Sequence, residues 1–264
     1  MPDANGRIRS VIGRRAWRWL GLIACLGCCG AWLVTPASLH AEDQPKRLTI
    51  WDIHIGEAAS EIPDEFVNYA CGTNGGPPAI PLAGFKEFSK CRPDADGLHE
   101  VYFEYDDELE YRARALNLPA EIRMYAGTTV FEFPVVASAL FDNSGRVRGL
   151  RMVTDPRQQV SRGRIEFWEL GRFLRQRFGD DHWDCKDLPP AAGESPVGSL
   201  FIKTHCEKTT SDGLRLVLEQ RLLQKKGQHF IDPHSGQAER DPFESMTRFE
   251  AYDAALPARA SVPN

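Results

Sequence analysis

The sequence predicts an α+β fold of two tandem units, each with a helical layer on a small antiparallel sheet and one local disulfide. Three observations predict it: runs of alternating apolar and polar residues, one amphipathic helix, and two cysteine pairs of nearly equal spacing. The units are expected at 42–157 and 158–256, with an extra segment near 106–128 in the first and a flexible tail at 257–264. The alternative is a single α+β domain with one continuous antiparallel sheet.

Alternating side chains mark the strands. In LHEVYFEY, Val101, Phe103 and Tyr105 alternate with glutamates, which is typical of a strand with one buried face. TVFEFPVVASALF is predicted as a longer apolar strand. VRGLRMVT is expected to pair back on it across the Asp/Asn/Ser/Gly turn that precedes it, and SMTRFEAY predicts the last strand.

The clearest helix is RIEFWELGRFLRQRFG. Phe167, Leu170, Leu174 and Phe178 follow one another at intervals of three and four residues, so they fall on one helical face. Gly179 is placed to end this helix. Shorter helices are predicted around PDEFVNYA and LAGFKEFSK.

The cysteines predict two disulfides. Three of the seven lie in the apolar stretch near the N-terminus, and the other four are Cys71, Cys91, Cys185 and Cys206. Four cysteines permit three pairings, and an even number in an exported chain indicates disulfides. Separations of 20 and 21 residues favour Cys71–Cys91 and Cys185–Cys206. Each such loop is expected to stabilise the fold by about 3 kcal/mol.

A short motif recurs after each cysteine pair. CRPDADGL begins at Cys91, and CEKTTSDGL begins at Cys206. The offset is 114 residues between the first cysteines, 115 between the second cysteines and 116 between Gly97 and Gly213. This near-constant offset predicts an internal duplication. A shared order of elements without common origin is the alternative.

The first 41 residues are typical of an export signal. Five arginines lie before residue 19, the stretch from Trp19 to Ala41 has no Asp, Glu, Lys or Arg, and its apolar centre covers 19–34. Cleavage is expected after Ala41 or, as the alternative, after Ala37. Two further alternatives hold the chain at a membrane: an uncleaved anchor at 19–34, or a lipid on Cys25. The predicted location is therefore periplasmic or secreted, with membrane anchoring as the alternative.

A helix-then-sheet unit in an exported chain is similar in outline to bacterial β-lactamase inhibitor proteins and to SmpA/OmlA-type envelope lipoproteins. Those families are small exported proteins in which such units occur once or in tandem. The resemblance concerns the outline of the fold, and it implies an exported α+β scaffold.

Charge excludes some partners. The chain carries a formal net charge of −5, and residues 1–41 carry five arginines and one aspartate, a net +4, which leaves about −9 for the remainder. An acidic body argues against nucleic acid and anionic membranes as partners, because both bind Lys/Arg surfaces. Membrane contact is expected only through an anchor. A protein or cell-envelope component is the expected partner, and no cofactor is expected.

Aromatic and charged residues gather around the extra segment. Aromatic side chains with arginines are common at binding hot spots, and ordinary core aromatics on a strand are the alternative. The acidic run at its start is also typical of a solvated turn or a helix start. The candidate partner-binding residues are Tyr105, Asp106, Asp107, Glu108, Tyr111, Arg112, Arg114 and Arg123.

A metal site is a weaker possibility. His229, Asp232 and His234 are residue types that bind zinc, although a simple turn at Pro233 also explains them. No G-x-S-x-G or H-E-x-x-H motif occurs in 42–264. The predicted function is an exported non-enzymatic protein that binds a protein or envelope component. The alternative is an exported hydrolase or metal-binding enzyme.

Overall fold

The computed structural model describes residues 47–105, 108–125, 127–155, 164–227, 229–231, 238–240 and 243–256. By its contacts, the chain from Pro45 to Asn264 forms one compact unit. The predicted signal, the boundary at 157/158 and the tail at 257–264 lie outside the described residues. Among those residues, no helix is long and apolar enough to span a membrane.

The chain forms twelve strands, three α-helices and three 3-10 helices within the described ranges. The strands are β1 (Val67–Cys71), β2 (His99–Glu104), β3 (Thr129–Val130), β4 (Phe133–Phe141), β5 (Val147–Thr154), β6 (Asp184–Asp187), β7 (Glu194–Ser195), β8 (Ile202–Thr209), β9 (Leu214–Lys225), β10 (His229–Ile231), β11 (Ala238–Arg240) and β12 (Phe243–Asp253). The helices are η1 (Ile50–Asp52), η2 (Phe85–Lys90), α1 (Glu108–Ala115), α2 (Pro119–Tyr125), η3 (Arg164–Glu169) and α3 (Leu170–Arg177).

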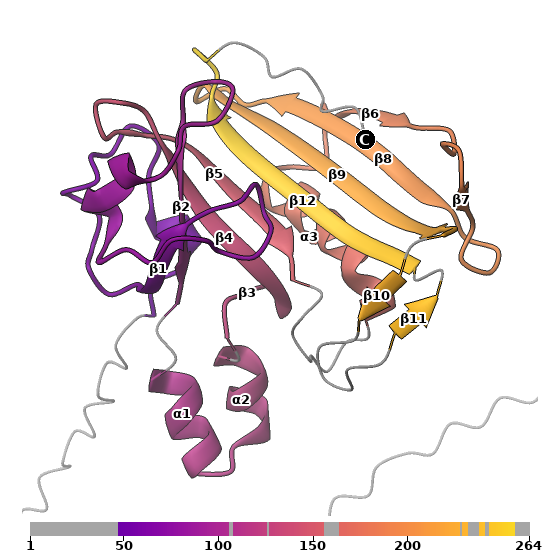
Figure 1. The fold of residues 1–264 in the computed structure, drawn as a ribbon, viewed down its shortest axis with the longest axis horizontal. Helices are drawn as coiled ribbons and strands as arrows, with labels where there is room; N and C mark the ends of the chain where they lie inside the picture. Colours follow the sequence, from indigo (N-terminus) through magenta and orange to yellow (C-terminus); the bar gives the residue numbers. More distant parts are fainter. Residues whose placement is uncertain are drawn as a thin grey trace, which may run out of the picture. The chain divides into compact units, whose positions relative to one another are not determined.

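One antiparallel sheet of ten strands dominates the fold (Figure 1). Its order is β1-β2-β4-β5-β12-β9-β8-β6, with β3 added to β4 and β7 added to β9, while β10 and β11 form a separate hairpin. The alternative of one continuous antiparallel sheet is confirmed. Two tandem units are not shown, and the duplication stays a prediction.

The last strand lies in the middle of the sheet. β12 pairs along one side with β5, from Arg248 opposite Val153 to Tyr252 opposite Gly149. Along its other side it pairs with β9 over its whole length. Among the described strands, β12 alone joins the strands of the first half of the chain to those of the second.

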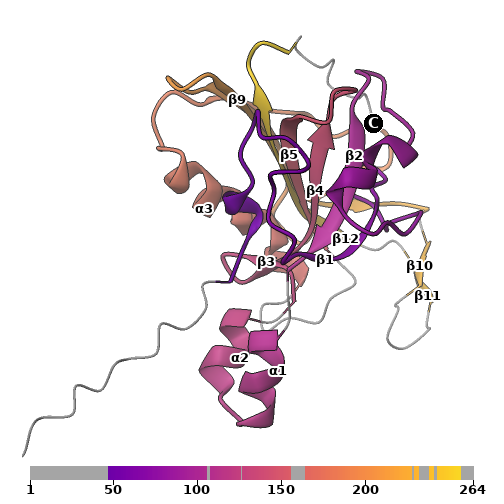
Figure 2. The same ribbon diagram turned by 90° about the vertical axis from the view of Figure 1, so that its left-hand side faces the viewer.

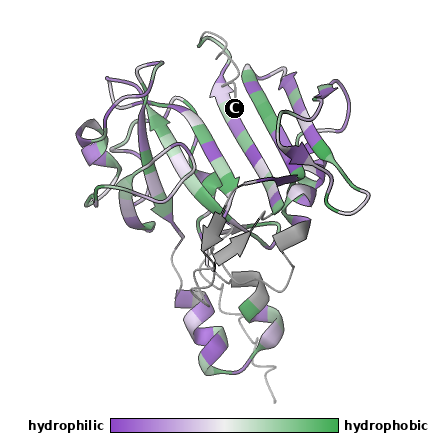
Figure 3. Ribbon diagram, turned by 45° about the vertical axis from the view of Figure 1, so that its right-hand side comes forward, coloured by the Kyte–Doolittle hydropathy of each residue, from purple (hydrophilic) through white to green (hydrophobic). Residues whose placement is uncertain are grey.

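The main core lies on the face of the sheet that α3 covers (Figure 2). Hydropathy alternates along several strands (Figure 3), most regularly along β9, whereas all nine residues of β4 are buried. Phe167, Leu170 and Leu174 from η3 and α3 are buried in this core with Leu218 and Phe249 from the sheet. Both predicted disulfides are present, Cys71–Cys91 and Cys185–Cys206.

Two predicted helices differ from the structure. PDEFVNYA is not helical: its second half belongs to β1, which pairs with β2, and Asn68 with φ +54° interrupts the register. The prediction was wrong because Phe66 is buried against Phe85 and Phe103, and this packing favours an extended chain. The helix predicted in RIEFWELGRFLRQRFG is divided into η3 and α3, and it ends before Gly179, whose φ is +82°.

Three hairpin turns of the same type lie at one end of the sheet. In each, the first residue accepts a hydrogen bond from the N–H of the glycine three residues later, as in Asp94–Gly97, Asp142–Gly145 and Thr210–Gly213. These turns lead into β2, β5 and β9, which run in the same direction because each is antiparallel to the strand between them. We call this the turn end of the sheet.

The two Asp-Gly-Leu motifs therefore form the same local turn. They do not occupy equivalent places in the sheet, since β2 is second from one edge and β9 is third from the other. The recurrence in the sequence is explained locally, by a turn that needs a positive φ at glycine: φ is +77° at Gly97 and +86° at Gly213.

Candidate functional site

The extra segment predicted near 106–128 contains a helical hairpin. Helices α1 and α2 follow β2, precede β3 and pack on each other (Figure 1). Ala113 is buried in the hairpin, and its carbonyl accepts a 2.9 Å hydrogen bond from the N–H of Leu118 in the turn between the helices. Glu110 fixes the base of the hairpin by accepting a 2.6 Å hydrogen bond from the N–H of Gly127.

The hairpin lies at the end of the sheet opposite the turn end. Strand β2 begins at the Asp94 turn and leads into α1, so its two ends mark the two ends of the sheet. Figures 1 and 2 show α1 and α2 projecting beyond the strands at this end. The two-residue turn Phe131–Glu132 lies at the same end, because it joins β3 to the start of β4. We call this the hairpin end.

Large apolar side chains are exposed at the hairpin end. The exposed fractions are 73% for Tyr111, 67% for Leu116, 36% for Leu118 and 39% for Phe131. These are four of the seven exposed large apolar residues in the described part of the chain, and they fall within 21 consecutive residues. Such a concentration is typical of an interaction site, whereas single exposed apolar residues are ordinary.

Phe131 is held in an unfavourable backbone conformation. Both turn residues have left-handed φ angles, +50° for Phe131 and +67° for Glu132. A two-residue hairpin turn of this kind favours Asn and Gly, because other side chains are strained there. The Phe131 ring stacks on Phe173 of α3 with centroids 5.7 Å apart, and the Arg172 guanidinium lies 4.9 Å from the centroid of the Phe173 ring. These contacts hold the aromatic ring at the surface.

The described chain begins at the base of the hairpin. Arg47 donates a 2.7 Å hydrogen bond to the carbonyl of Gly127, and its guanidinium lies 5.3 Å from the Tyr105 ring centroid. The Tyr105 hydroxyl accepts a 2.8 Å hydrogen bond from the N–H of Ile50. Tyr105 is buried, and this burial raises the pKa of its hydroxyl. Tyr105 is therefore a core residue, which corrects its selection as an exposed binding residue.

The other predicted binding residues have different outcomes. Glu108, Tyr111, Arg112 and Arg114 are exposed on α1, where Arg114 forms an ion pair with Glu110 at 2.6 Å. Asp106 and Asp107, and the side chain of Arg123, lie outside the described residues. The apolar residues Leu116, Leu118 and Phe131 were not predicted; Asn117 between the two leucines was a turn signal in the sequence, whereas none marked the turn at Phe131.

The metal candidates are not described. Asp232, His234 and the side chain of His229 lie outside the described residues. Within the ranges that the structure does describe, no group of three His, Cys, Asp or Glu residues could hold a metal ion. The metal-binding hypothesis stays a prediction.

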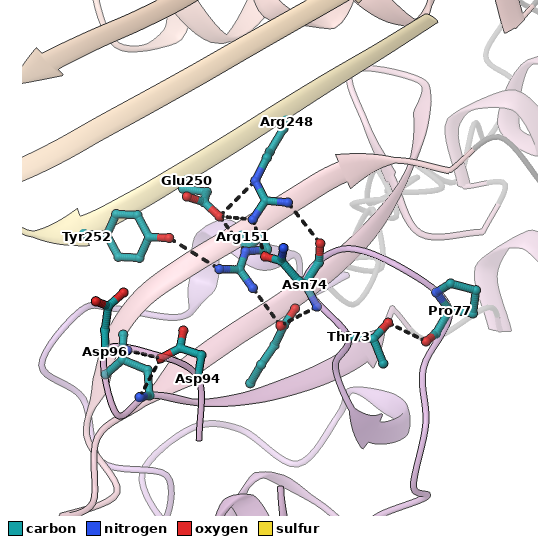
Figure 4. A network of polar contacts seen from close by, with 11 residues as sticks. Thr73, Asn74, Pro77, Asp94, Asp96, Arg151, Arg248, Glu250 and Tyr252 are labelled. Carbon is teal, nitrogen blue, oxygen red and sulfur yellow. Dashed lines mark hydrogen bonds and ion pairs between the residues drawn. The ribbon is translucent and has the colours of Figure 1, made fainter. Parts of the chain in front are cut away.

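A cluster of polar residues lies on the face of the sheet opposite the main core (Figure 4). Arg151 is only 2% exposed and donates hydrogen bonds to Glu250 at 2.5 Å and to Glu100 at 2.6 Å. Arg248 contacts Glu250 and also donates to the carbonyl and side-chain oxygens of Asn74, at 3.0 and 2.5 Å. The N–H of Asn74 donates to Glu100 at 2.7 Å.

This cluster has balanced charges. Burial alone would raise the pKa of Glu250, but Arg151 and Arg248 lower it to about 2. Two arginines face two carboxylates, and Asn74 ties the loop between Cys71 and Cys91 to β12. The cluster therefore holds separate parts of the chain together. The chemical arrangement is that of a structural ion network, whereas the hairpin end presents side chains to the outside.

Comparison with known proteins gave no significant match, whether to a family model, to a curated protein or to a solved structure.

Proposed function

We propose that the protein is an exported, non-enzymatic binding protein that contacts a protein or cell-envelope component through its hairpin end. The observation that carries the proposal is the exposure of Tyr111, Leu116, Leu118 and Phe131 at one end of the molecule. Tyrosine is enriched at binding hot spots, and a concentration of exposed large apolar residues marks an interaction site.

The disulfides support export. Two disulfides point to an oxidising, extracellular environment, since thiols are kept reduced in the cytosol. The apolar stretch at 19–34 and the arginines before it supply the proposed export signal.

The finer proposal of two related units is supported by the place of the disulfides and not by the Asp-Gly-Leu strands, since β2 and β9 do not correspond in the strand order. Reading inward from its two edges, the sheet presents β1-β2-β4-β5 and β6-β8-β9-β12. Each set places a disulfide cysteine on its edge strand, Cys71 on β1 and Cys185 on β6. In this proposal, the α1–α2 hairpin is an addition to the first unit, and an added segment is a common carrier of binding function.

A matched pair of triple variants tests the function. Photo-crosslinking from position 111 in the exporting cell identifies the partner, which is then purified for titration. We expect Tyr111→Ser/Leu116→Ser/Leu118→Ser to weaken its affinity at least about tenfold, because each serine removes an apolar contact. The control Ile80→Ser/Leu188→Ser/Leu200→Ser changes three apolar residues that are exposed outside the helical hairpin; Leu188 and Leu200 lie beside β6 and β8, near the opposite edge of the sheet.

Both triple variants should keep the Tm of the parent protein, since all six side chains are exposed. The proposal is wrong if the two variants lose affinity equally, or if neither loses any.

A further inference from the structure

We propose that the Cys185–Cys206 disulfide is a thiol-exchange site, and that its reduction by a dithiol releases the edge strand β6 from the sheet. This inference goes beyond the proposed function, because it concerns the edge formed by β6 and β8 and not the hairpin end. Three observations carry it: the exposure of one of the two cysteines, the weak non-covalent pairing of β6, and the contacts that anchor the chain on both sides of this strand.

One cysteine of this disulfide is exposed and the other is buried. Cys185 is exposed on β6, whereas the exposed fraction of Cys206 on β8 is 0%. A thiolate therefore attacks the Sγ of Cys185, which breaks the S–S bond and releases Cys206 as a thiolate that takes up a proton. The second thiol of the reductant attacks the mixed disulfide and frees Cys185. The protein gains two electrons and two protons, and the dithiol becomes a disulfide.

The non-covalent pairing of β6 is weak. Among the described strands, β6 is the outermost and pairs with β8 alone, and all four of its residues are exposed (Figure 1). Its sequence is DCKD, and Asp and Lys are depleted in strands. Asp184 lies directly opposite Glu207, and like charges at such positions are destabilising. The hydrogen bond from Thr204 to Asp187, at 2.8 Å, lies at the exposed surface.

The register shows which backbone groups β6 covers. The N–H of Leu188 donates a 2.7 Å hydrogen bond to the carbonyl of Lys203, and these two residues form the next pair after β6 in its register with β8. Hydrogen-bonded and non-hydrogen-bonded pairs alternate along an antiparallel ladder, so every second residue of β8 bonds to β6 and the others bond to β9. The amides of β8 that face β6 are those of His205 and Glu207, and the amides that face β9 are those of Thr204 and Cys206.

Contacts on both sides of β6 limit how much of the chain can open. Before the strand, the Lys208 ammonium holds three carbonyls of the segment that follows α3, and the Trp183 indole donates to the carbonyl of Gly179 at 2.8 Å. After it, Glu194 on β7 forms a 2.8 Å ion pair with Lys203, and their side chains are 7% and 10% exposed. The segment that can leave the sheet is therefore 184–193. Its departure exposes the edge of β8 and leaves the rest of the sheet closed.

The other disulfide is held differently and serves as the matched control. Cys71 and Cys91 are 4% and 2% exposed. Strand β1 pairs with β2 on one side, and on its other side the N–H of Cys71 donates a 2.8 Å hydrogen bond to the carbonyl of Ile80. Because β1 has backbone partners on both sides, cleavage of Cys71–Cys91 is expected to leave β1 in place.

The test compares amide hydrogen exchange before and after the disulfide is opened. Dithiothreitol is the reductant, and mass analysis of alkylated aliquots identifies the point at which Cys185–Cys206 alone is open. We expect exchange at His205 and Glu207 to accelerate roughly a hundredfold, in line with the loss of a cross-link that closes a loop of this length. Thr204 and Cys206 should keep their protection, because their amides face β9. This alternation distinguishes release of β6 from a general loss of stability.

Variants and a monothiol complete the test. Cys185→Ser/Cys206→Ala should show the same alternation without reductant, and the control Cys71→Ala/Cys91→Ala should leave exchange in β6 and β8 as in the parent protein. Reduced glutathione reports which sulfur is attacked, because a monothiol leaves a mixed disulfide. Peptide mapping of quenched samples should find glutathione on Cys185 and an alkylated thiol at Cys206.

Several outcomes overturn the inference. These are opening of Cys71–Cys91 before or together with Cys185–Cys206, continued protection of His205 and Glu207 after cleavage, and glutathione on Cys206. Equal acceleration at all four amides of β8, or failure of Cys185→Ser/Cys206→Ala to fold, would show that the disulfide is only a structural cross-link. The hairpin end takes no part in these measurements, so their failure leaves the proposed function standing.

Discussion

Arg151 is the largest side chain among those that are almost fully buried, and its contacts span the chain. Its partner Glu100 lies 51 residues before it, and its partner Glu250 lies 99 residues after it. Alternation along LHEVYFEY predicts a solvated Glu100, and the structure buries it instead. The reason is the loop that carries Asn74, which folds over this face of the sheet; no pattern within the strand indicates such a cover.

Replacement of Arg151 tests the strength of this network. We expect Arg151→Met to lower the free energy of unfolding by about 3–5 kcal/mol, because buried Glu100 loses its arginine and buried Glu250 keeps only Arg248. The control Arg148→Met removes a more exposed arginine that pairs with Asp253 at 3.1 Å, and it should cost about 0–1 kcal/mol. Urea unfolding of both variants measures the difference. Similar losses of unfolding free energy in Arg151→Met and Arg148→Met would show that burial does not make the Arg151 network stronger than the Arg148–Asp253 pair.

The low pKa of Glu250 predicts loss of stability in acid. Its pKa in the folded state is lowered from 4.5 to about 2, so the folded protein resists protonation of this carboxylate. The resulting stabilisation, up to about 3 kcal/mol, is present above pH 4.5 and is lost as the pH falls toward 2. Urea unfolding at several pH values should show a shallower acid dependence for Glu250→Gln than for the parent protein. Parallel pH profiles would contradict the assignment.

At the scale of elements, alternation predicted the strands better than it predicted the helices. Alternating runs placed β2, β5 and β12, where one face meets the core. TVFEFPVVASALF was predicted as one strand, but the Phe131–Glu132 turn divides it into β3 and β4. The turn was not predicted because no residue type in this stretch indicates a tight turn. PDEFVNYA failed for the opposite reason: its helical pattern is local, whereas pairing with β2 is a long-range contact.

Helix α3 ends on a lysine from a distant strand. The Lys208 ammonium donates to the carbonyls of Phe178, Gly179 and Asp181 at 2.7–2.9 Å, and it thereby satisfies carbonyls that follow the last helical turn. We expect Lys208→Met to cost about 1–3 kcal/mol, seen as a Tm lower by roughly 2–4 °C per kcal/mol.

Lys186→Met is the matched control for this cap. Lys186 is on the neighbouring strand β6, is 70% exposed and lies 3.5 Å from Asp184. It should leave the Tm almost unchanged. A comparable loss in Lys186→Met would mean that a general loss of positive charge, and not the cap, explains the result.

For the whole molecule, the sequence predicted both disulfides and the α+β class. It did not predict that β12 joins the two halves of the sheet. Nearly equal cysteine spacing predicted both disulfides correctly. The predicted extra segment contains exposed Tyr111, but Tyr105 proved to be buried, and exposed Leu116 and Leu118 were not predicted. Exposure depends on how the two helices pack on each other, and that packing is not encoded in any single motif.

The two disulfides should differ in their resistance to reduction. Cys71 and Cys91 are both buried, whereas Cys185 is exposed on β6 at the sheet edge. Because exchange requires access of a thiolate to a disulfide sulfur, we expect mild reductant to open Cys185–Cys206 first. Timed alkylation followed by peptide mapping measures both rates in one sample. Equal rates, or earlier opening of Cys71–Cys91, would contradict the prediction.

The central position of β12 has a consequence for biosynthesis. A nascent chain that has not emerged past Asp253 lacks the strand that pairs with both β5 and β9. Until then Arg151 has no Glu250, and the Asn74 loop has no Arg248. The sheet can close only after β12 has been synthesised. Until β12 is available, the described strands β1 to β5 and β6 to β9 have no shared partner, so the joining of the two halves is expected to be a late step of folding.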